Sequence, residues 1–585
     1  MAAKKSTPKK STHRPPSETE QQREANRRIA RREAREKARI EAFEKASPRI
    51  LNTVTALQAN GKQPGPTAYA GTRILVARSA VTQELIIELT EVANSLGWKL
   101  DASDALTAPK RAHRAALGVA RLELSTTSDG QIKKPDAWAF LQAVRAGRKR
   151  GAKVNDVGLD HLIAIGDVSG NPYTMGNPYT MGNPYTMGNP YTMGNPYTMG
   201  NPYTMGNPYT MGNPYTMGNP YTMGNPYTMG NPYTMGNPYS PAIASYGMPG
   251  SGGRQPVAFV GPEPARTPNG AFKGRRPVVA TLDTGCGRHA WLDKFVRTNV
   301  KLDGKPIGHT DARTDPELHP DLVGPADGGL DEYSGHGTFI AGLIRQANPD
   351  ADIVAWRITP SEGPIAESDL IDALADIAEL ARRHRDGERG GHPIDVLSLS
   401  LSYYHESPDD VDFDSTVYGP LRLLGECGVA VVCSVGNDAT TRPAYPAAFA
   451  PWSNGKGVVK PEKDVIPIVS VGALNPNGSD AMFSNAGPWV RAYAAGASVM
   501  STVPAMAGGY QPAAATVLDG RIRQSPDMDD FSSGFALWSG TSFAAPLYAA
   551  WISAKLPTIS KTNDNRKAAL ARVWPVITFG TKIKP

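Results

Sequence analysis

The chain has 585 residues and a formal net charge of +7, a length that exceeds one ordinary domain and indicates two or three parts. Residues 1–50 hold 15 Lys or Arg and 7 Asp or Glu, so they carry +8 and the rest of the chain carries −1. The basic character therefore belongs to one segment and gives little support for nucleic-acid binding by the main body. Three cysteines, an odd number, argue against a disulfide framework and favour reduced thiols.

The composition of residues 1–50 predicts a basic tail. The first 17 residues are rich in Lys, Ser, Thr and Pro, a composition typical of disorder, and residues 18–46 are rich in helix formers with charge pairs at helical spacing. A solvated helix is one interpretation, and contact with nucleic acid or an anionic surface is the other. No apolar segment follows Met1 and no run of about 20 apolar residues occurs, so we expect a cytoplasmic protein without a membrane span.

Residues 72–166 predict a small α+β domain. Apolar residues alternate at 120–124, run without interruption at 74–77 and 162–165, and recur at helical spacing over 81–96, whereas a Pro near its first turn marks the helix at 135–146. The order is β-α-β-β-α-β, which is the split βαβ, or ferredoxin-like, arrangement. We expect strands at 73–77, 99–101, 120–124 and 162–165, and helices at 81–96 and 135–146.

Residues 171–240 predict a low-complexity linker. The hexad Asn-Pro-Tyr-Thr-Met-Gly occurs eleven times without variation from Asn171 to Gly236. Each copy has a Pro, which cannot donate to a strand ladder, and a Gly, which loosens the backbone. The repeat has no aliphatic wall from which a β-helix would be built. A flexible spacer is therefore predicted, and weak self-association through Tyr and Met is the alternative.

Residues 275–575 predict an α/β domain with a mainly parallel sheet flanked by helices. Strand-like runs alternate with helical ones, and runs such as Val429–Val432 are apolar without interruption, which indicates burial on both faces. We expect strands at 277–282, 352–358, 394–401, 429–435 and 465–471, and helices at 337–345, 368–383 and 413–427.

Four residues of this domain are suited to acyl transfer by a hydroxyl group. Asp283 ends a predicted strand, at the edge of a parallel sheet where catalytic groups collect. His336 lies between two glycines and opens a helix, and Ser542 begins another helix with its backbone N–H free to face an oxyanion. Asn437 follows a buried strand and offers a side-chain amide as a second donor. A nucleophile, a base, an orienting carboxylate and oxyanion donors are what this chemistry needs.

The motifs around these residues resemble those of the subtilisin-like serine proteases (subtilases, peptidase family S8) over roughly residues 275–560. They occur in the chain order of that family and are specific as a set. They are Asp283-Thr284-Gly285, His336-Gly337-Thr338, Gly436-Asn437 and Gly540-Thr541-Ser542-Phe543-Ala544-Ala545-Pro546.

The resemblance implies a serine endopeptidase with Asp283, His336 and Ser542 as the triad and Asn437 in the oxyanion hole. It also implies that residues 400–402, namely Ser400, Leu401 and Ser402, pair with the backbone of a protein or peptide substrate, with Ser402 in place of the usual Gly. No cofactor and no catalytic metal are expected. A structural calcium ion cannot be placed from the sequence, since its ligands include backbone oxygens.

Many subtilases carry an N-terminal βαββαβ prodomain that inhibits the site with its last strand, and the resemblance extends this interpretation to residues 72–166. Cleavage between Ile165 and Pro277 would then release the inhibitor, whereas an unrelated accessory domain is the alternative. Two other functions stay open at this stage. One is a catalytically silent peptide-binding protein, and the other is a recruiting protein that acts through the basic tail.

Overall fold

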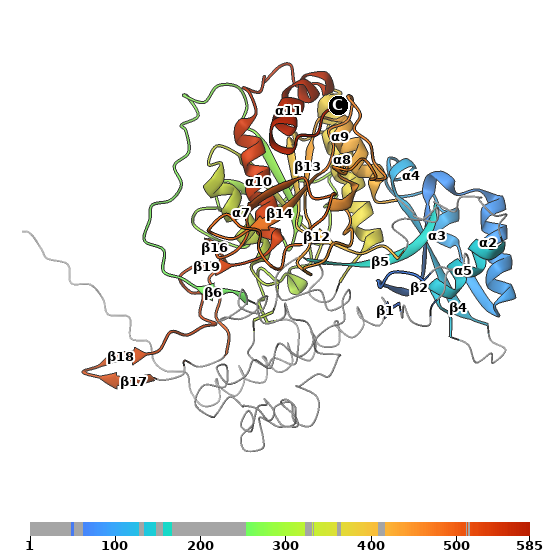
Figure 1. The fold of residues 1–585 in the computed structure, drawn as a ribbon, viewed down its shortest axis with the longest axis horizontal. Coiled ribbons are helices and arrows are strands. Elements are labelled where there is room, and N and C mark those ends of the chain that lie inside the picture. The colour runs from blue at the N-terminus through green and yellow to red at the C-terminus, as the bar shows by residue number, and fades with distance from the viewer. Residues whose placement is uncertain are drawn as a thin grey trace, which may run out of the picture.

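The structure is a computed structural model, and it describes two bodies that lie side by side (Figure 1). The smaller body is drawn in blue and the larger one in green to red. The tail up to residue 47 and the repeat predicted at 171–240 lie outside the described residues. The described residues are 48–51, 56, 63–127, 134–147, 156–165, 253–321, 330–331, 333–359, 364–406, 416–509, 512 and 515–585.

The larger body is built on a parallel sheet with the strand order β15-β14-β13-β11-β7-β9-β8. Every residue of the central strands β7, β11 and β13 is buried. This burial explains their largely apolar sequences, since neither face of the strands meets water. The strands are β7 (Val278–Asp283), β8 (Val296–Arg297), β9 (Asp352–Arg357), β11 (Val396–Leu399), β13 (Ala430–Ser434), β14 (Val469–Leu474) and β15 (Ala492–Ala495).

Helices cover both faces of this sheet. Leu282 of β7 lies in the core that α8 and α9 build, and Val279, three positions earlier in the same strand, lies in the core that α7, α10 and α11 build. The two cores are on opposite faces because side chains alternate along a strand. The helices are α7 (His336–Ala347), α8 (Glu367–Arg385), α9 (Tyr418–Glu426), α10 (Thr541–Lys555) and α11 (Arg566–Thr581).

The smaller body has an antiparallel sheet with the strand order β5-β2-β4-β3. Along the chain its main elements follow one another in the order β2-α2-β3-β4-α5-β5, and β1 pairs with β2. The sheet thus begins before residue 72 and takes in the end of the segment 1–50. The elements are β1 (Pro48–Ile50), β2 (Ala68–Ala77), α2 (Gln83–Ser95), β3 (Trp98–Asp101), α3 (Ser103–Leu106), α4 (Arg114–Leu117), β4 (Val119–Thr126), α5 (Ala137–Gly147) and β5 (Val157–Ile165).

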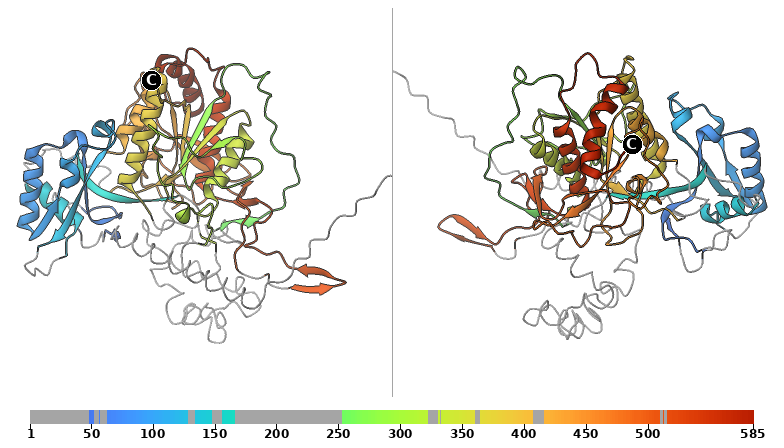
Figure 2. Two further views of the ribbon diagram at one scale, coloured as in Figure 1. Left: turned by 180° about the vertical axis from the view of Figure 1, so that it is seen from behind. Right: turned by 45° about the horizontal axis from the view of Figure 1, so that its top comes forward.

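Strand β5 connects the two bodies. It leaves the small sheet and pairs antiparallel with two short strands of the larger body, β10 (Ile365–Ala366) and β12 (Leu401–Ser402). The views in Figures 1 and 2 show this strand, in teal, running from the smaller body into the larger one. Since β5 pairs with β2 as well, one continuous sheet contains strands of both bodies.

The remaining strands lie at the edges of the larger body. β6 (Gln255–Pro256), β19 (Phe535–Trp538) and β16 (Val499–Thr502) form a three-stranded sheet. β17 (Ala515–Leu518) and β18 (Arg521–Gln524) form a hairpin that projects from the body (Figure 2). The larger body therefore includes residues before 275, and α11 extends it past 575. In the part of the chain that the structure describes, no helix combines the length and the apolarity that a membrane crossing requires.

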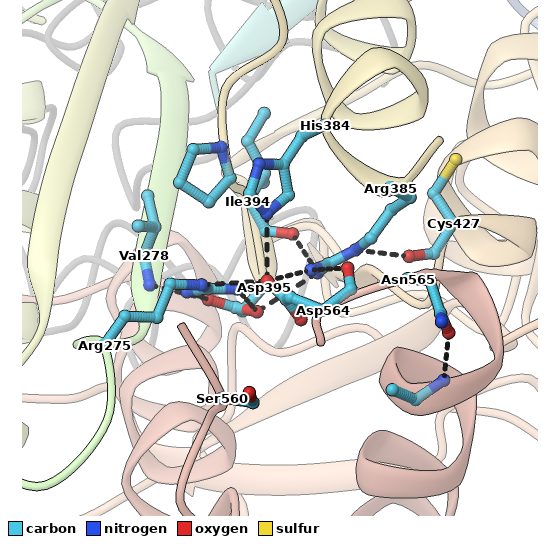
Figure 3. Close-up of polar contacts among 12 residues, drawn as sticks. Arg275, Val278, His384, Arg385, Ile394, Asp395, Cys427, Ser560, Asp564 and Asn565 are labelled. Carbon is cyan, nitrogen blue, oxygen red and sulfur yellow. Dashed lines mark hydrogen bonds and ion pairs between the residues drawn. The ribbon is translucent and has the colours of Figure 1, made fainter. Parts of the chain in front are cut away.

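A largely buried ionic network ties the residues just before α11 to the start of β7 (Figure 3). Arg275 donates to both oxygens of Asp395, at 2.6 and 2.8 Å, and reaches Asp564 at 2.5 Å. Arg385 contacts the same two carboxylates. Asp395 also accepts the backbone N–H of Val278 at 2.9 Å, so the network fixes the first residue of β7.

Candidate active site

Two of the residues predicted from the sequence as catalytic, Asp283 and His336, meet at the carboxyl edge of the parallel sheet. Asp283 is the last residue of β7 and His336 is the first residue of α7, and both are buried. His336 Nδ1 donates to Asp283 Oδ1 at 2.7 Å, which orients the imidazole ring. His336 Nε2 is buried and has no hydrogen-bond partner among the described residues. A base held in this way presents its second nitrogen for proton transfer.

Helix α7 can approach β7 so closely because Gly337 lacks a side chain. A Cβ atom at Gly337 would lie 2.1 Å from the backbone oxygen of Gly285, in the Asp283-Thr284-Gly285 motif. The glycine after His336 is therefore a steric requirement of the Asp283–His336 contact.

Ser542 is the second residue of α10 and lies next to the predicted substrate-binding segment. The Ser400 hydroxyl donates to the backbone oxygen of Ser542 at 2.8 Å, and Ser542 Oγ lies 3.5 Å from the backbone oxygen of Ser400. The ring of the neighbouring Phe543 lies 5.3 Å from the ring of His336, centroid to centroid. The start of α10 thus packs against the imidazole, with the hydroxyl at the same edge of the sheet.

Asn437 lies in the loop after β13 and contacts the residue before Ser542. Its Oδ1 accepts the backbone N–H and the hydroxyl of Thr541, each at 2.8 Å. Because only the oxygen of the side-chain amide can accept these two bonds, they identify it as the atom that faces Thr541. The Nδ2 group is therefore on the side opposite Thr541. Nδ2 is buried and has no hydrogen-bond partner among the described residues. A buried amide donor in this state, on a side chain held by the residue before Ser542, is suited to bind a developing oxyanion.

The sequence analysis missed Glu317, which is buried beside the Asp283–His336 pair. Its Oε1 accepts from the Thr284 hydroxyl at 2.5 Å and the Gly337 backbone N–H at 3.0 Å, and its Oε2 accepts from the Thr338 hydroxyl at 2.5 Å. Burial, with the nearby charges of Asp315 and Asp283, raises the pKa of Glu317 to about 7. Glu317 thus joins the loop after β7 to the first turn of α7.

The predicted substrate-pairing segment is occupied by the protein's own strand β5. Leu401 pairs with Ile165 and Ser402 with Ala164 on one side of β5, and Ile365 pairs with Ile163 on the other. The Ile163 side chain is fully buried in the core of the larger body. An extended segment paired on both sides is the way in which a peptide adds to open strand edges.

Charged residues extend this contact between the bodies. His161 of β5 has no exposed surface, and it lies between Glu367, the first residue of α8, and Glu406. Its Nδ1 donates to Glu367 Oε2 at 2.5 Å and its Nε2 donates to Glu406 Oε2 at 2.9 Å. Although burial opposes the charged form, these carboxylates raise the pKa of His161 well above its usual value.

Within the described residues, one group could offer ligands to a metal ion, namely His161, His405 and Glu406, with ligand atoms within 4.8 Å of one another. Both ring nitrogens of His161 already face carboxylates, which is the hydrogen bonding of an imidazolium ion and not that of a metal ligand. The hydrogen bonding therefore fits a protonated His161 better than a bound metal ion.

A second charged contact lies on α8. Arg114 of α4 donates to Asp376 Oδ2 at 2.6 Å and to Asp372 Oδ2 at 2.8 Å. Arg111 and His113 also contact Asp376. Burial opposes ionisation of Asp376, but these hydrogen bonds hold the pKa of its carboxyl to about 2.

The three cysteines are free thiols. Cys427 and Cys433 are buried, and Cys286 is partly buried three residues after Asp283. Burial raises the pKa of each thiol, and for Cys427 the pKa is about 11. Such thiols are poor nucleophiles, so none of them competes with Ser542 for that role.

A parallel α/β sheet with a carboxylate, an imidazole and a hydroxyl near its carboxyl edge is typical of hydrolases that form an acyl-enzyme, the subtilisin-like serine peptidases among them. Within that class, residues 274–570, about half of the chain, match the model of the subtilase family (Peptidase S8). The chain belongs to the subtilase family.

Several curated proteins are similar to the chain. Mycosin-4 of Mycobacterium tuberculosis (strain ATCC 25618 / H37Rv) is 25% identical over 49% of this chain and 58% of that protein. An intracellular serine protease of Paenibacillus polymyxa is 24% identical over 40% of this chain and 60% of that protein. Subtilisin BL of Lederbergia lenta is 28% identical over 35% of this chain and 70% of that protein. The chain thus spans less than two thirds of the first two of these relatives.

Among solved structures, fervidolysin from Fervidobacterium pennivorans, a keratinolytic enzyme related to subtilisin, matches with a TM-score of 0.38 and 16% identity. The match covers 83% of this chain and 54% of that chain.

Proposed function

We propose that the protein is a serine endopeptidase whose triad is Asp283, His336 and Ser542. The observation that carries the proposal is the bond of 2.7 Å between Asp283 and a His336 whose Nε2 is buried and without a partner among the described residues. The subtilase motifs at both residues support it.

In the proposed mechanism, His336 Nε2 takes the proton of the Ser542 hydroxyl as Oγ attacks the substrate carbonyl. Asp283 stays ionised and stabilises the imidazolium that forms. Asn437 Nδ2 and the backbone N–H of Ser542 donate to the oxyanion. His336 then gives its proton to the leaving amine, and a water molecule, deprotonated by the same nitrogen, hydrolyses the acyl-enzyme.

Residues 400–402 would hold the substrate backbone on one side and β10 on the other. Support comes from β5, which already pairs with both in the manner of a bound peptide. The pairing of Leu401 with Ile165 brings the end of β5 to the residue next to Ser400, whose backbone oxygen lies 3.5 Å from Ser542 Oγ. The N-terminal domain would therefore act as an inhibitory prodomain, and the chain would cut itself in the first residues after Ile165.

The test compares the full chain with its Ser542→Ala variant by intact-mass spectrometry. We expect the wild-type chain to yield a fragment that ends within a few residues of Ile165, and the variant to stay whole. A fluorophosphonate probe should label Ser542 in the wild type once the groove is open. Identical fragments in both proteins would exclude self-processing, and a wild type that neither reacts with the probe nor cuts an added peptide would overturn the peptidase proposal.

A further inference from the structure

The contacts of His161 carry an inference about substrates, and it rests on the proposed peptidase function. β5 occupies the groove as a peptide would, so each side chain that it directs into the larger body marks a subsite. Ile163 fills an apolar one, in the core built with Leu401 and Leu370. His161, two residues earlier, is directed to the same side and lies among charged groups.

Four groups of the larger body surround the His161 ring, and one of them is the ring of His405, at 5.0 Å between centroids. The carboxylates of Glu367 and Glu406 accept from its two nitrogens, and the ring of Tyr403 stacks on it at 4.9 Å with an interplanar angle of 28°. The Tyr403 hydroxyl donates to Glu367 Oε1 at 3.0 Å, which holds this carboxylate in place. Two carboxylates and an aromatic face are a combination that binds a cation.

The register shows that this pocket is part of the groove. β10 ends at Ala366, paired with Leu162, so that Glu367 follows directly opposite His161. The backbone N–H of His161 also faces Glu367 Oε2, at 3.4 Å. An extended substrate paired in the same way places its residue at this position against the same carboxylates.

The charge balance of the pocket changes when the N-terminal domain leaves. His161 and Arg145, which lies 3.5 Å from Glu406 Oε1, both belong to that domain and depart with it. Burial alone would raise the pKa of Glu406, but the charges of His405, His161 and Arg145 hold it well below its usual range. His405 stays beside Glu406. The two buried carboxylates nevertheless lose His161 and Arg145, so a new cation in the place of His161 restores part of the lost charge balance.

We propose that Glu367, Glu406 and Tyr403 form an acidic subsite that selects a cationic side chain, Lys, Arg or protonated His, in the peptide substrate. The selected residue is the one that takes the place of His161, four residues before the position of Ile165. His161 is the built-in occupant of this subsite.

The test uses the full chain and quenched peptides that reproduce residues 157–170, with Lys, Arg, Gln or Glu at the position of His161. While β5 is docked, the groove is open in only a fraction of the molecules, and this fraction scales kcat/KM equally for every peptide. The ratio of kcat/KM values between two peptides is therefore independent of how often β5 is docked. We expect Lys and Arg to exceed Gln by about 10-fold or more, since each would gain a charge-assisted hydrogen bond, and Glu to be the poorest.

The double variant Glu367→Gln/Glu406→Gln should bring the Lys-to-Gln ratio close to 1. The matched control Glu462→Gln, at an exposed carboxylate paired with Arg422, should keep the wild-type ratio. Equal rates for Lys and Gln in the wild type would overturn the subsite, and so would a ratio that the double variant leaves unchanged.

Binding to the Ser542→Ala chain, measured by fluorescence anisotropy with the same peptides, separates the two proposals. A preference for Lys in binding without any cleavage by the wild type would retain the subsite and reject the peptidase. Cleavage with no preference in either assay would retain the peptidase and reject the subsite.

Discussion

Glu317 accepts a hydrogen bond at 3.0 Å from the backbone N–H of Gly337, the residue that follows His336. The same oxygen accepts the Thr284 hydroxyl, which itself lies 3.2 Å from Asp283 Oδ1. Glu317 thus contacts the chain neighbours of Asp283 and of His336. It positions these two side chains relative to each other without touching a substrate.

The first prediction concerns the pH dependence of stability. The pKa of Glu317 rises from 4.5 to about 7 on folding, so its contribution to stability is full below pH 4.5 and is lost as the pH rises through 7. Relative to Glu317→Gln, the wild-type chain should lose on the order of 3 kcal/mol between these limits. Urea unfolding of both proteins at pH 4.5, 6 and 8 measures the difference, and parallel profiles would contradict it.

The second prediction concerns Asn437. Asn437→Ala removes the Nδ2 donor and should lower kcat by about 10²–10³-fold with little change in KM, which is the loss known for the equivalent amide of subtilisin. Steady-state kinetics on one peptide measures both constants. A rise in KM with unchanged kcat would instead assign Asn437 to ground-state binding.

The third prediction concerns the docking of β5. His161→Gln removes the positive charge between Glu367 and Glu406 and should weaken docking of the N-terminal domain by roughly 3 kcal/mol. The full chain should then cut an added peptide faster than the wild type does, and the amides of β5 should exchange hydrogen faster. Glu84→Gln, at an exposed position of α2, is the control and should match the wild type. Unchanged exchange in His161→Gln would contradict the assignment.

The fourth prediction concerns acid. The pKa of Asp376 is held to about 2 in the folded protein, below the ordinary value of 3.8, so its contribution to stability is present above pH 4 and is lost as the pH falls through 2. Asp376→Asn should lower the melting temperature at pH 6 and change it much less near pH 2. Calorimetry at both values checks this, and an equal loss at both would show that charge is not the cause.

The fifth prediction concerns the network of Figure 3. Asp564→Asn removes a carboxylate that contacts Arg275, Arg385 and His384. Because Arg385 is buried and would keep only one of its two carboxylate partners, the variant should lose on the order of 3 kcal/mol of stability. Thermal unfolding measures the loss, and a melting temperature within a degree of the wild type would contradict it.

Much of the α/β core was predictable from the sequence because its elements carry local signals. The strands predicted at 277–282 and 429–435 match β7 and β13 to within one residue at each end, and the helix predicted at 368–383 lies inside α8. The residues of the predicted triad stand in short motifs at element ends, Asp283 at the end of β7, His336 at the start of α7 and Ser542 at the start of α10, so each motif indicated a place in the fold.

Other features have no local signal. β10 and β12 are two residues long and exist as strands through their pairing with β5, so no periodicity marks them. Glu317 lies in a loop without a motif. His161 and Glu406 are 245 positions apart, and a charge in a sequence does not reveal which distant charge it will meet. Such contacts are set by the tertiary fold alone.

Strand β5 has a further consequence, which concerns concentration. While the chain is whole, blocking of the groove is an intramolecular equilibrium, and its extent is the same in a dilute and a concentrated solution. A single cut after β5 would make this blocking a binding equilibrium between two separate chains, and dilution would shift that equilibrium toward the open groove. The amount of protein present would then set the activity of the cleaved form, with no change in any contact.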